Sequence, residues 1–222
     1  QYNGLNTPLI SNIIFAVETD QTGAVWFGQQ WGGVVKFDGS NWTAYTPSNS
    51  DYPAEYTDAI ECDLDGNIWF GTIDQGVVKF DGSNWTVYNT TNSGLPNNWV
   101  TCLASDSEGS MWIGTFGGGL AKFDGTDWTI YDNSNSGLFH NSVLSLAFDQ
   151  NGLLWVAIYG YGLYTFDGAT WTLYDNEDYE GLICGANTLY FDSDGKLWYG
   201  GCCIITFDGT EWETIQLSDV TI

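Results

Sequence analysis

The chain has 222 residues, of which 43% are hydrophobic and 17% aromatic, so it is long and apolar enough to bury a core and is not intrinsically disordered. Its 28 acidic residues face only four basic ones, all lysine, which gives a formal net charge of −24. Such a surface repels nucleic-acid phosphates and anionic lipid headgroups, and no apolar run approaches the roughly 20 residues of a membrane-spanning helix. The composition predicts a soluble globular protein without a transmembrane segment that binds neither nucleic acid nor a membrane surface.

The strongest pattern along the chain is a tryptophan that recurs with a period of 43 residues. An Asp and a Gly precede each tryptophan at fixed spacing, and a Phe-Asp-Gly-x-x-Trp segment follows it, with the last copy two residues early. A fixed period of about 20–50 residues indicates a repeat architecture. The copies account for nearly the whole chain, which predicts a single domain, 1–222. The periodic tryptophans are Trp26, Trp69, Trp112, Trp155 and Trp198, and the Phe-Asp-Gly segments begin at Phe37, Phe80, Phe123, Phe166 and Phe207.

Each repeat contains four short runs of strand-forming residues separated by turn residues. In the third repeat these runs are residues 100–105, 111–115, 120–123 and 128–131. Asp-Gly between apolar runs is a hairpin signal, and no stretch has helical periodicity. A four-stranded unit of about 40–45 residues is the size of one propeller blade. We therefore predict an all-β, five-bladed β-propeller with four antiparallel strands per blade and blades near residues 11–46, 56–89, 99–132, 142–175 and 185–217.

Most of the repeated residues have a structural interpretation. Trp26 and its equivalents lie mid-strand, where a large ring fills the wedge between neighbouring blades, and Trp42 with Tyr45 and their equivalents stiffen the outer strand. A lysine precedes Phe-Asp-Gly in the first three repeats. We expect these lysines to point outward from the third strand and to pair with carboxylates, with the main role of keeping the protein soluble. They are Lys36, Lys79 and Lys122.

The motifs D-x-x-G-x-h-W-h-G-T, G-G-h-x-x-F-D-G, W-T-x-Y and N-S-G-L, clearest in residues 106–115, 118–125 and 128–138, resemble the two-component-regulator propeller repeat over nearly the whole chain. The resemblance implies propellers that serve as periplasmic ligand-sensing domains of hybrid histidine kinases. Closely similar repeats occur in secreted surface proteins that carry a type IX sorting domain. The sequence holds five repeats, where sensor propellers usually hold more, and we expect neither a kinase domain nor a membrane anchor. We therefore expect a free-standing extracellular or cell-surface propeller, with a signal peptide and any sorting segment removed.

Positions that break the repeat are the candidates for function, because positions that are alike in every blade serve the scaffold. In a meander blade, the loop between strands two and three opens on the same face as the connection into the next blade. The exceptions concentrate in these two places and predict a binding face of aromatic and polar side chains. Its residues are Gln30, Trp31, Tyr56, Trp99, Phe116, His140, Tyr159 and Tyr161.

Exposed rings beside amide side chains suit a sugar, whose C–H faces stack on rings while its hydroxyls bond to amides, and they equally suit a peptide or protein hot spot. The alternative is that these rings only plug a narrow channel. The leading hypothesis is a non-catalytic extracellular propeller that binds a glycan or a cell-envelope protein, as an adhesin or as a subunit of a surface complex. The alternatives are a ligand-sensing propeller that serves a separate two-component kinase and a polysaccharide-active enzyme.

Catalytic and metal chemistry find little support in the sequence. His140 is the sole histidine, so sites that need several imidazoles are excluded, and no isolated carboxylate pair breaks the repeat, with Glu55 and Asp74 the nearest approach. We therefore expect no enzyme activity and no cofactor. Calcium is the one ion to consider, since Asp63-Leu-Asp65-Gly66 echoes a calcium loop, but its remaining ligands are missing and a capped hairpin turn explains it.

Three of the five cysteines break the repeat in the fifth blade and are candidates for a disulfide. Cys184 lies at the start of that blade, and Cys202 and Cys203 replace the glycine loop. A bond from Cys184 to either of the other two would brace the loop in an oxidising compartment, and a vicinal bond is the other possibility. Cys62 and Cys102 lie near opposite ends of neighbouring strands, so we expect both to be buried thiols.

Overall fold

The computed structural model describes residues 7–175, 188–201 and 203–215, and all its regular elements are short β-strands. In chain order they are β1 (Ile14–Thr19), β2 (Val25–Gln29), β3 (Val34–Phe37), β4 (Trp42–Tyr45), β5 (Thr57–Cys62), β6 (Ile68–Thr72), β7 (Val77–Phe80), β8 (Trp85–Tyr88), β9 (Val100–Ser105), β10 (Met111–Thr115), β11 (Gly119–Phe123), β12 (Trp128–Tyr131), β13 (Val143–Phe148), β14 (Leu154–Ile158), β15 (Gly162–Phe166), β16 (Trp171–Tyr174), β17 (Thr188–Phe191), β18 (Leu197–Gly200), β19 (Ile204–Phe207) and β20 (Trp212–Ile215).

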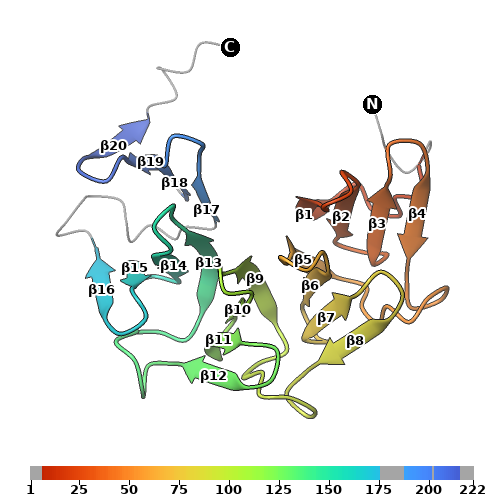
Figure 1. Ribbon diagram of the computed structural model, residues 1–222, viewed down its shortest axis with the longest axis horizontal. Helices are drawn as coiled ribbons and strands as arrows, with labels where there is room; N and C mark the ends of the chain where they lie inside the picture. The colour runs from red at the N-terminus through yellow and green to blue at the C-terminus, as the bar shows by residue number, and fades with distance from the viewer. Residues whose placement is uncertain (1–6, 176–187, 202, 216–222) are drawn as a thin grey trace. The chain divides into compact units, whose positions relative to one another are not determined.

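Each consecutive set of four strands forms one four-stranded sheet in sequence order (Figure 1). Neighbouring strands are antiparallel, as in the first blade, where Trp26 on β2 lies opposite Glu18 on β1 and Lys36 on β3. The prediction of an all-β protein built from five four-stranded propeller blades is confirmed. Strand bounds in the third blade match the predicted runs, except that β11 begins one residue earlier, at Gly119.

The chain divides into two compact units. The N-terminal unit comprises residues 1–115 and 121–130, and the C-terminal unit comprises residues 116–120 and 131–222. Within the N-terminal unit the first strands of successive blades, β1, β5 and β9, pack side by side, and within the C-terminal unit β13 packs beside β17. The prediction of a single domain stays a prediction.

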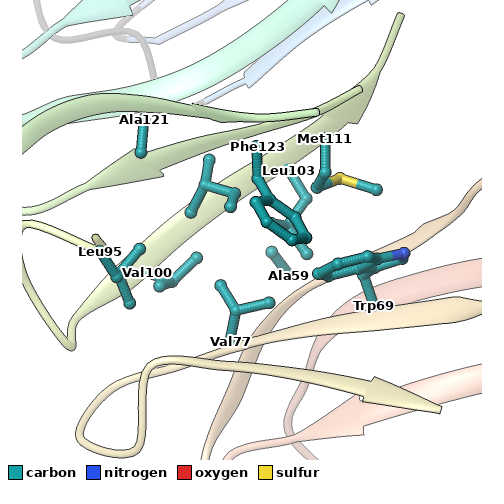
Figure 2. Packing of buried hydrophobic residues seen from close by; sticks show 10 residues of the cluster. Ala59, Trp69, Val77, Leu95, Val100, Leu103, Met111, Ala121 and Phe123 are labelled. Atoms are coloured by element: carbon teal, nitrogen blue, oxygen red, sulfur yellow. The ribbon is translucent and has the colours of Figure 1, made fainter. Parts of the chain in front are cut away.

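Three of the periodic tryptophans, Trp26, Trp69 and Trp155, pack between neighbouring blades of one unit, as predicted. Trp26 is 1% exposed, stacks on Tyr45 of its own blade and meets Phe70 of the next blade edge-on, with ring centroids 5.6 and 5.5 Å away. Figure 2 shows the next wedge, where Trp69 lies beside Met111 and Phe123 of the third blade. These aromatic contacts join consecutive blades within the N-terminal unit through apolar burial.

The last periodic tryptophan differs from the others in exposure. Trp198 is 37% exposed, whereas Trp155 in the preceding blade is 4% exposed and packs against Phe191 and Phe207 of the fifth blade. Among the described residues of the C-terminal unit, no further strand after β20 packs on the Trp198 ring as the fifth blade packs on Trp155.

The repeated Asp before each tryptophan is the centre of a polar cluster within one blade. Asp20 Oδ1 accepts the backbone N–H groups of Thr22 and Ala24, and its Oδ2 accepts the Trp26 indole N–H at 3.0 Å. Lys36 Nζ lies 3.0 Å from the same Oδ2 and 5.0 Å from the Trp26 ring centroid. Burial alone would raise the pKa of Asp20, but a hydrogen bond from the Thr22 hydroxyl, together with the bonds from Trp26, Lys36 and Ala24, outweighs burial and holds the pKa well below its ordinary value.

The lysines thus have a larger role than the sequence indicated. The expected pairing with carboxylates is confirmed for Lys36 and for Lys122, whose Nζ lies 3.1 Å from Asp106. Both ammonium groups also lie over a tryptophan face, a contact that we did not predict. Solubility is therefore an incomplete account of these side chains, because they close the polar cluster beside the wedge tryptophan.

The fourth blade lacks this cluster. Thr165 stands at the lysine position, and Asp149 accepts backbone N–H groups of its turn through Oδ1. The Trp155 indole N–H is buried and has no hydrogen-bond partner among the described residues. A buried donor without a partner carries a desolvation cost, so the hydrogen bonds around this turn stabilise the fourth blade less than the corresponding bonds stabilise the first blade.

Two further sequence expectations concern membrane contact and the thiols. None of the residues described by the structure forms a helix long and apolar enough to cross a membrane. Cys62 and Cys102 are free thiols, as expected; each residue as a whole is partly exposed, and burial raises the pKa of both thiol groups. Cys203 is a free thiol too, whereas Cys184 and Cys202, the other disulfide candidates, lie outside the described residues.

Candidate functional site

The variable loops are linked to each other by backbone hydrogen bonds. In each of the first three blades the loop between the second and third strands donates an N–H to the connection that enters the next blade. Examples are Gly33 to Glu55 at 3.2 Å, Gly76 to Asn98 at 3.1 Å and Gly117 to Asn141 at 3.0 Å. These bonds hold the two loop types together at the same end of the strands, as the meander topology predicted.

In the N-terminal unit, the first pair of predicted site residues is brought into contact. Trp31, which is 53% exposed, meets Tyr56 with ring centroids 4.2 Å apart and an interplanar angle of 54°. Burial, followed by the charge of Glu55, raises the pKa of Tyr56. The Glu55 carboxylate accepts the N–H of Gly32 at 3.1 Å, and Gln30 is half-buried, with its N–H bonded to the Ile13 carbonyl. Glu55 therefore braces the loop that presents Trp31.

The other predicted residue of the N-terminal unit, Trp99, is 38% exposed and is held by a carboxylate. Its indole N–H donates to Asp58 Oδ2 at 3.1 Å. Burial raises the pKa of Asp58, and the bond from Trp99 lowers it, with burial the larger effect. This bond fixes the plane of the indole at the loop surface.

In the C-terminal unit the structure brings four predicted residues into one aromatic cluster. Phe116 lies edge-on to Tyr159 at 6.4 Å between centroids, and His140 lies 6.2 Å from Tyr159 and 5.9 Å from Tyr161, stacked on the latter. The imidazole Nδ1 accepts the backbone N–H of Ser142 at 3.0 Å, so it is held by its own loop. The ring of His140 is therefore fixed in place beside Tyr161.

Sequence reasoning missed one ring of this cluster, Phe139. It is 60% exposed and lies 6.0 Å from Tyr161, and its N–H donates to the Tyr164 hydroxyl at 3.2 Å. The signal was present in the repeat, because Pro53 and Pro96 occupy the same position in the earlier connections. We define the C-terminal ring cluster as Phe116, Phe139, His140, Tyr159 and Tyr161.

The structure also places the acidic residues that the sequence singled out for catalysis or metal binding. Asp74 is exposed, and Glu55 is bonded to the loop backbone. The expectation that Asp63 caps a hairpin turn is confirmed, since its carboxylate accepts the N–H groups of Asp65 and Asn67. Over residues 7–175, 188–201 and 203–215 no group of three or more His, Cys, Asp or Glu side chains is placed to hold a metal ion.

Comparison with known proteins identifies the repeat. Residues 94–117 and 137–160 match the family described as two component regulator propeller. The two matched segments cover less than half of the chain, and they are similar to this repeat. No curated protein matches the sequence.

Among solved structures, this repeat chain is similar to the extracellular domain of BT3049 from B. thetaiotaomicron, which is assigned to the hybrid two-component systems. The sequence identity is 25% and the TM-score 0.81, over 95% of this chain and 30% of that one. The extracellular domain of BT4673 from the same organism, assigned to the one-component systems, gives 22% identity and a TM-score of 0.78 over 93% and 31%. This propeller chain therefore spans about a third of the length of these relatives.

Two other likenesses extend to the fold alone. PorZ, a surface component of the type IX secretion system of Porphyromonas gingivalis, gives 15% identity and a TM-score of 0.67 over 93% of this chain and 34% of that one. Virginiamycin B lyase from Staphylococcus aureus, in a form inactivated by substitution of a histidine, gives 14% identity and a TM-score of 0.75 over 96% of this chain and 74% of that one. The blade architecture is thus shared by regulators, a secretion component and an enzyme, so the fold does not specify chemistry.

Proposed function

We propose that this chain is a non-catalytic extracellular propeller that binds a glycan or a cell-surface protein through the aromatic side chains of its variable loops. The observation that carries the proposal is the C-terminal ring cluster, in which Phe139 is 60%, Tyr159 55% and Tyr161 41% exposed although each ring contacts another ring of the cluster. Large exposed rings on short loops that are fixed by backbone bonds are pre-organised for contact, so little conformational entropy is lost on binding.

The chemistry of these rings favours stacking against a ligand. The apolar C–H faces of a sugar ring, or the apolar side chains of a protein, gain by covering exposed aromatic surface, and the Tyr hydroxyls and nearby backbone supply hydrogen bonds. The Trp31–Tyr56 pair of the N-terminal unit offers a second exposed aromatic surface of the same kind. The proposal invokes no covalent step, and it needs neither a metal nor a cofactor.

A sensor role is the second candidate, favoured by the 25% identity to the extracellular domain of a hybrid two-component system. In that case the same rings would bind the ligand, and a kinase domain would report its presence. Both candidates require ligand binding at the variable loops, so one experiment addresses their common basis.

The test measures binding of the purified protein to a glycan array and capture of proteins from the native cell envelope, identified by mass spectrometry. Tyr159→Ala with Phe139→Ala removes two exposed rings, and Trp31→Ala tests the other unit. The matched control is Tyr190→Ala, which removes a ring that is 63% exposed on strand β17.

We expect each variable-loop ring to contribute about tenfold or more in affinity, the effect typical of an aromatic hot spot, while the control binds as the wild type does. A glycan hit lost in the variants supports a sugar ligand, and a captured protein lost in the variants supports a protein partner. Hits that survive both sets of substitutions, or no hit in either assay, would refute the proposal.

A further inference from the structure

A second candidate site lies in the N-terminal unit, at the end of the strands away from the variable loops. A cavity of about 350 Å³ opens between the turns of the second and third blades. The walls are Trp69, Lys79 and Tyr88 on one side and Phe123 with the acidic residues Glu108 and Asp124 on the other. Equivalent cavities between the first and second blades and between the fourth and fifth measure about 190 and 200 Å³. One of the three is thus nearly twice as large as the others.

The size difference has a cause in the sequence. In the first blade the Gln21 amide reaches across the wedge and donates to the carbonyls of Asp63 and Leu64 at 3.1 and 2.9 Å. Gln150 does the same in the fourth blade, at 3.5 Å from the Ser193 carbonyl. The second blade has Leu64 at this position, which has no donor and is 59% exposed. The wedge between the second and third blades is therefore left without its amide bridge.

The same cavity holds the lysine that departs from the repeat. Asp63 accepts the Asn67 side-chain amide at 2.8 Å through Oδ2, the oxygen that in Asp20 meets Lys36. The other blades have Ala, Ser, Leu or Lys where the second has Asn67. Among the described residues Lys79 makes no ion pair, and its Nζ lies 5.1 Å from the Trp69 ring centroid. Asn67 has thus displaced the ammonium group from its repeat partner and left it to line the cavity.

The charges around the cavity narrow the class of ligand. The lining holds one ammonium group, from Lys79, and four carboxylates. Asp63 is bonded to Asn67 and Trp69, and the other three, Asp65, Glu108 and Asp124, form an acidic rim. A simple anion is disfavoured by that rim and by the net charge of −24, and a simple cation leaves Lys79 without a partner. A metal ion is not indicated, since the described residues form no metal-binding group. A molecule with one group of each sign matches both parts of the wall.

We propose that this cavity binds a small zwitterion, with its carboxylate on Lys79 and its ammonium group on the acidic rim, while its apolar part lies along Tyr88 and Phe123. A cavity of about 350 Å³ is at the small end of ligand pockets, which suits a free amino acid or a similar molecule. The proposal is independent of ligand binding at the variable loops, because the cavity lies wholly in the N-terminal unit and shares no residue with those loops.

The test is calorimetric titration of the intact protein with L-lysine and with cadaverine, its decarboxylated counterpart. Cadaverine has the larger positive charge, so general attraction to the acidic protein would favour it. We expect the wild type to bind L-lysine about tenfold more tightly than cadaverine, because only L-lysine has a carboxylate for Lys79.

Substitutions that restore the repeat give the sharpest variants. Asn67→Ala copies Ala24 of the first blade and frees Asp63 for Lys79, and Leu64→Gln copies the amide bridge, so each should weaken L-lysine binding about tenfold without unfolding the protein. Lys79→Met should abolish the preference for L-lysine over cadaverine, and Lys36→Met, in the neighbouring wedge, should leave it intact.

Melting temperatures of all variants verify folding. Equal affinity of the wild type for the two probes, or a preference that survives Lys79→Met, would overturn the proposal. D-glucuronate serves as a third probe, and its binding in the absence of L-lysine binding would overturn the assignment to zwitterions.

Discussion

The Asp20 cluster allows a quantitative test of the packing argument, because the fourth blade supplies a natural comparison. In Asp20→Asn the amide oxygen can still accept the turn N–H groups, but the new NH₂ replaces the oxygen that accepts from Trp26 and Lys36. The Trp26 indole N–H, in a side chain that is 1% exposed, would then lack an acceptor, which costs about 1–3 kcal/mol. Loss of the pair with the partly exposed lysine adds up to about 1 kcal/mol.

We therefore expect Asp20→Asn to lower the free energy of unfolding by about 3 kcal/mol. Asp149→Asn removes a carboxylate that has neither an indole nor a lysine partner, so its expected cost is about 1 kcal/mol, from the weaker turn bonds. For a chain of this size about 1 kcal/mol corresponds to a shift of roughly 2–4 °C in melting temperature. Thermal unfolding followed by tryptophan fluorescence at pH 7 measures both variants.

The pH dependence gives a second measurement of the same effect. Hydrogen bonds hold the pKa of Asp20 below its unfolded value, so the charged carboxylate stabilises the fold above the unfolded pKa of about 3.9. That stability is lost as the pH falls through the folded pKa, and the difference between wild type and Asp20→Asn should shrink over the same range. Equal destabilisation by Asp20→Asn and Asp149→Asn, or a difference that does not change in acid, would refute the reasoning.

Three further predictions concern the backbone, acid titration and thiol chemistry. Gly76→Ala should lower the free energy of unfolding by about 3 kcal/mol, because the residue has φ of +83° and a Cβ would collide with the Tyr88 carbonyl. Gly82→Ala, at φ +93° in open space, should lower it by only about 1 kcal/mol. Urea denaturation compares the two variants, and equal costs would contradict the clash. Backbone and side-chain hydrogen bonds in the turn of Asp208 lower the pKa of this carboxyl group to about 2, so carboxyl NMR should show it still charged at pH 3. The stability that these bonds add should be lost as the pH falls through about 2. Titration of Asp208 near pH 4 would count against those bonds. Burial raises the pKa of the Cys102 thiol to about 12. Mass spectrometry should therefore find Cys102 unmodified by iodoacetamide at pH 8 until urea unfolds the protein. Rapid labelling of Cys102 in the folded protein would contradict the burial of its thiol.

The fold could be predicted from the sequence because each blade repeats the same local sequence pattern. Alternating strand formers, Asp-Gly turns and a tryptophan at fixed spacing specify the strands, and five copies of one pattern average out local ambiguity. The one displaced bound, at Gly119, falls in a glycine run that carries no side-chain pattern. Glycine is needed there because it has φ of +89° beside the Tyr131 carbonyl, which the sequence does not reveal.

The candidate sites were predicted in part. Departures from the repeat located every described ring of the C-terminal ring cluster except Phe139, which breaks the same pattern. The cavity at the opposite end was missed for a different reason. The changes that create it, Leu64 and Asn67, lie in a turn whose Asp and Gly are perfectly repeated, so the turn was assigned to the scaffold. Only the three-dimensional contacts show that Asn67 occupies the place of an ammonium group.

The polar cluster of Asp, Trp and Lys has a consequence for how such proteins change over evolutionary time. In the first blade all three side chains belong to the same blade, so its buried polar groups are satisfied without help from a neighbour. When a neighbouring blade is exchanged this cluster stays intact, and only contacts between blades need to be remade, such as the Trp26–Phe70 ring contact and the hydrogen bonds from Gln21 to the second blade. We expect whole blades to be duplicated or deleted more readily than parts of a blade, so that the lengths of chains built from this repeat should differ in steps of one repeat.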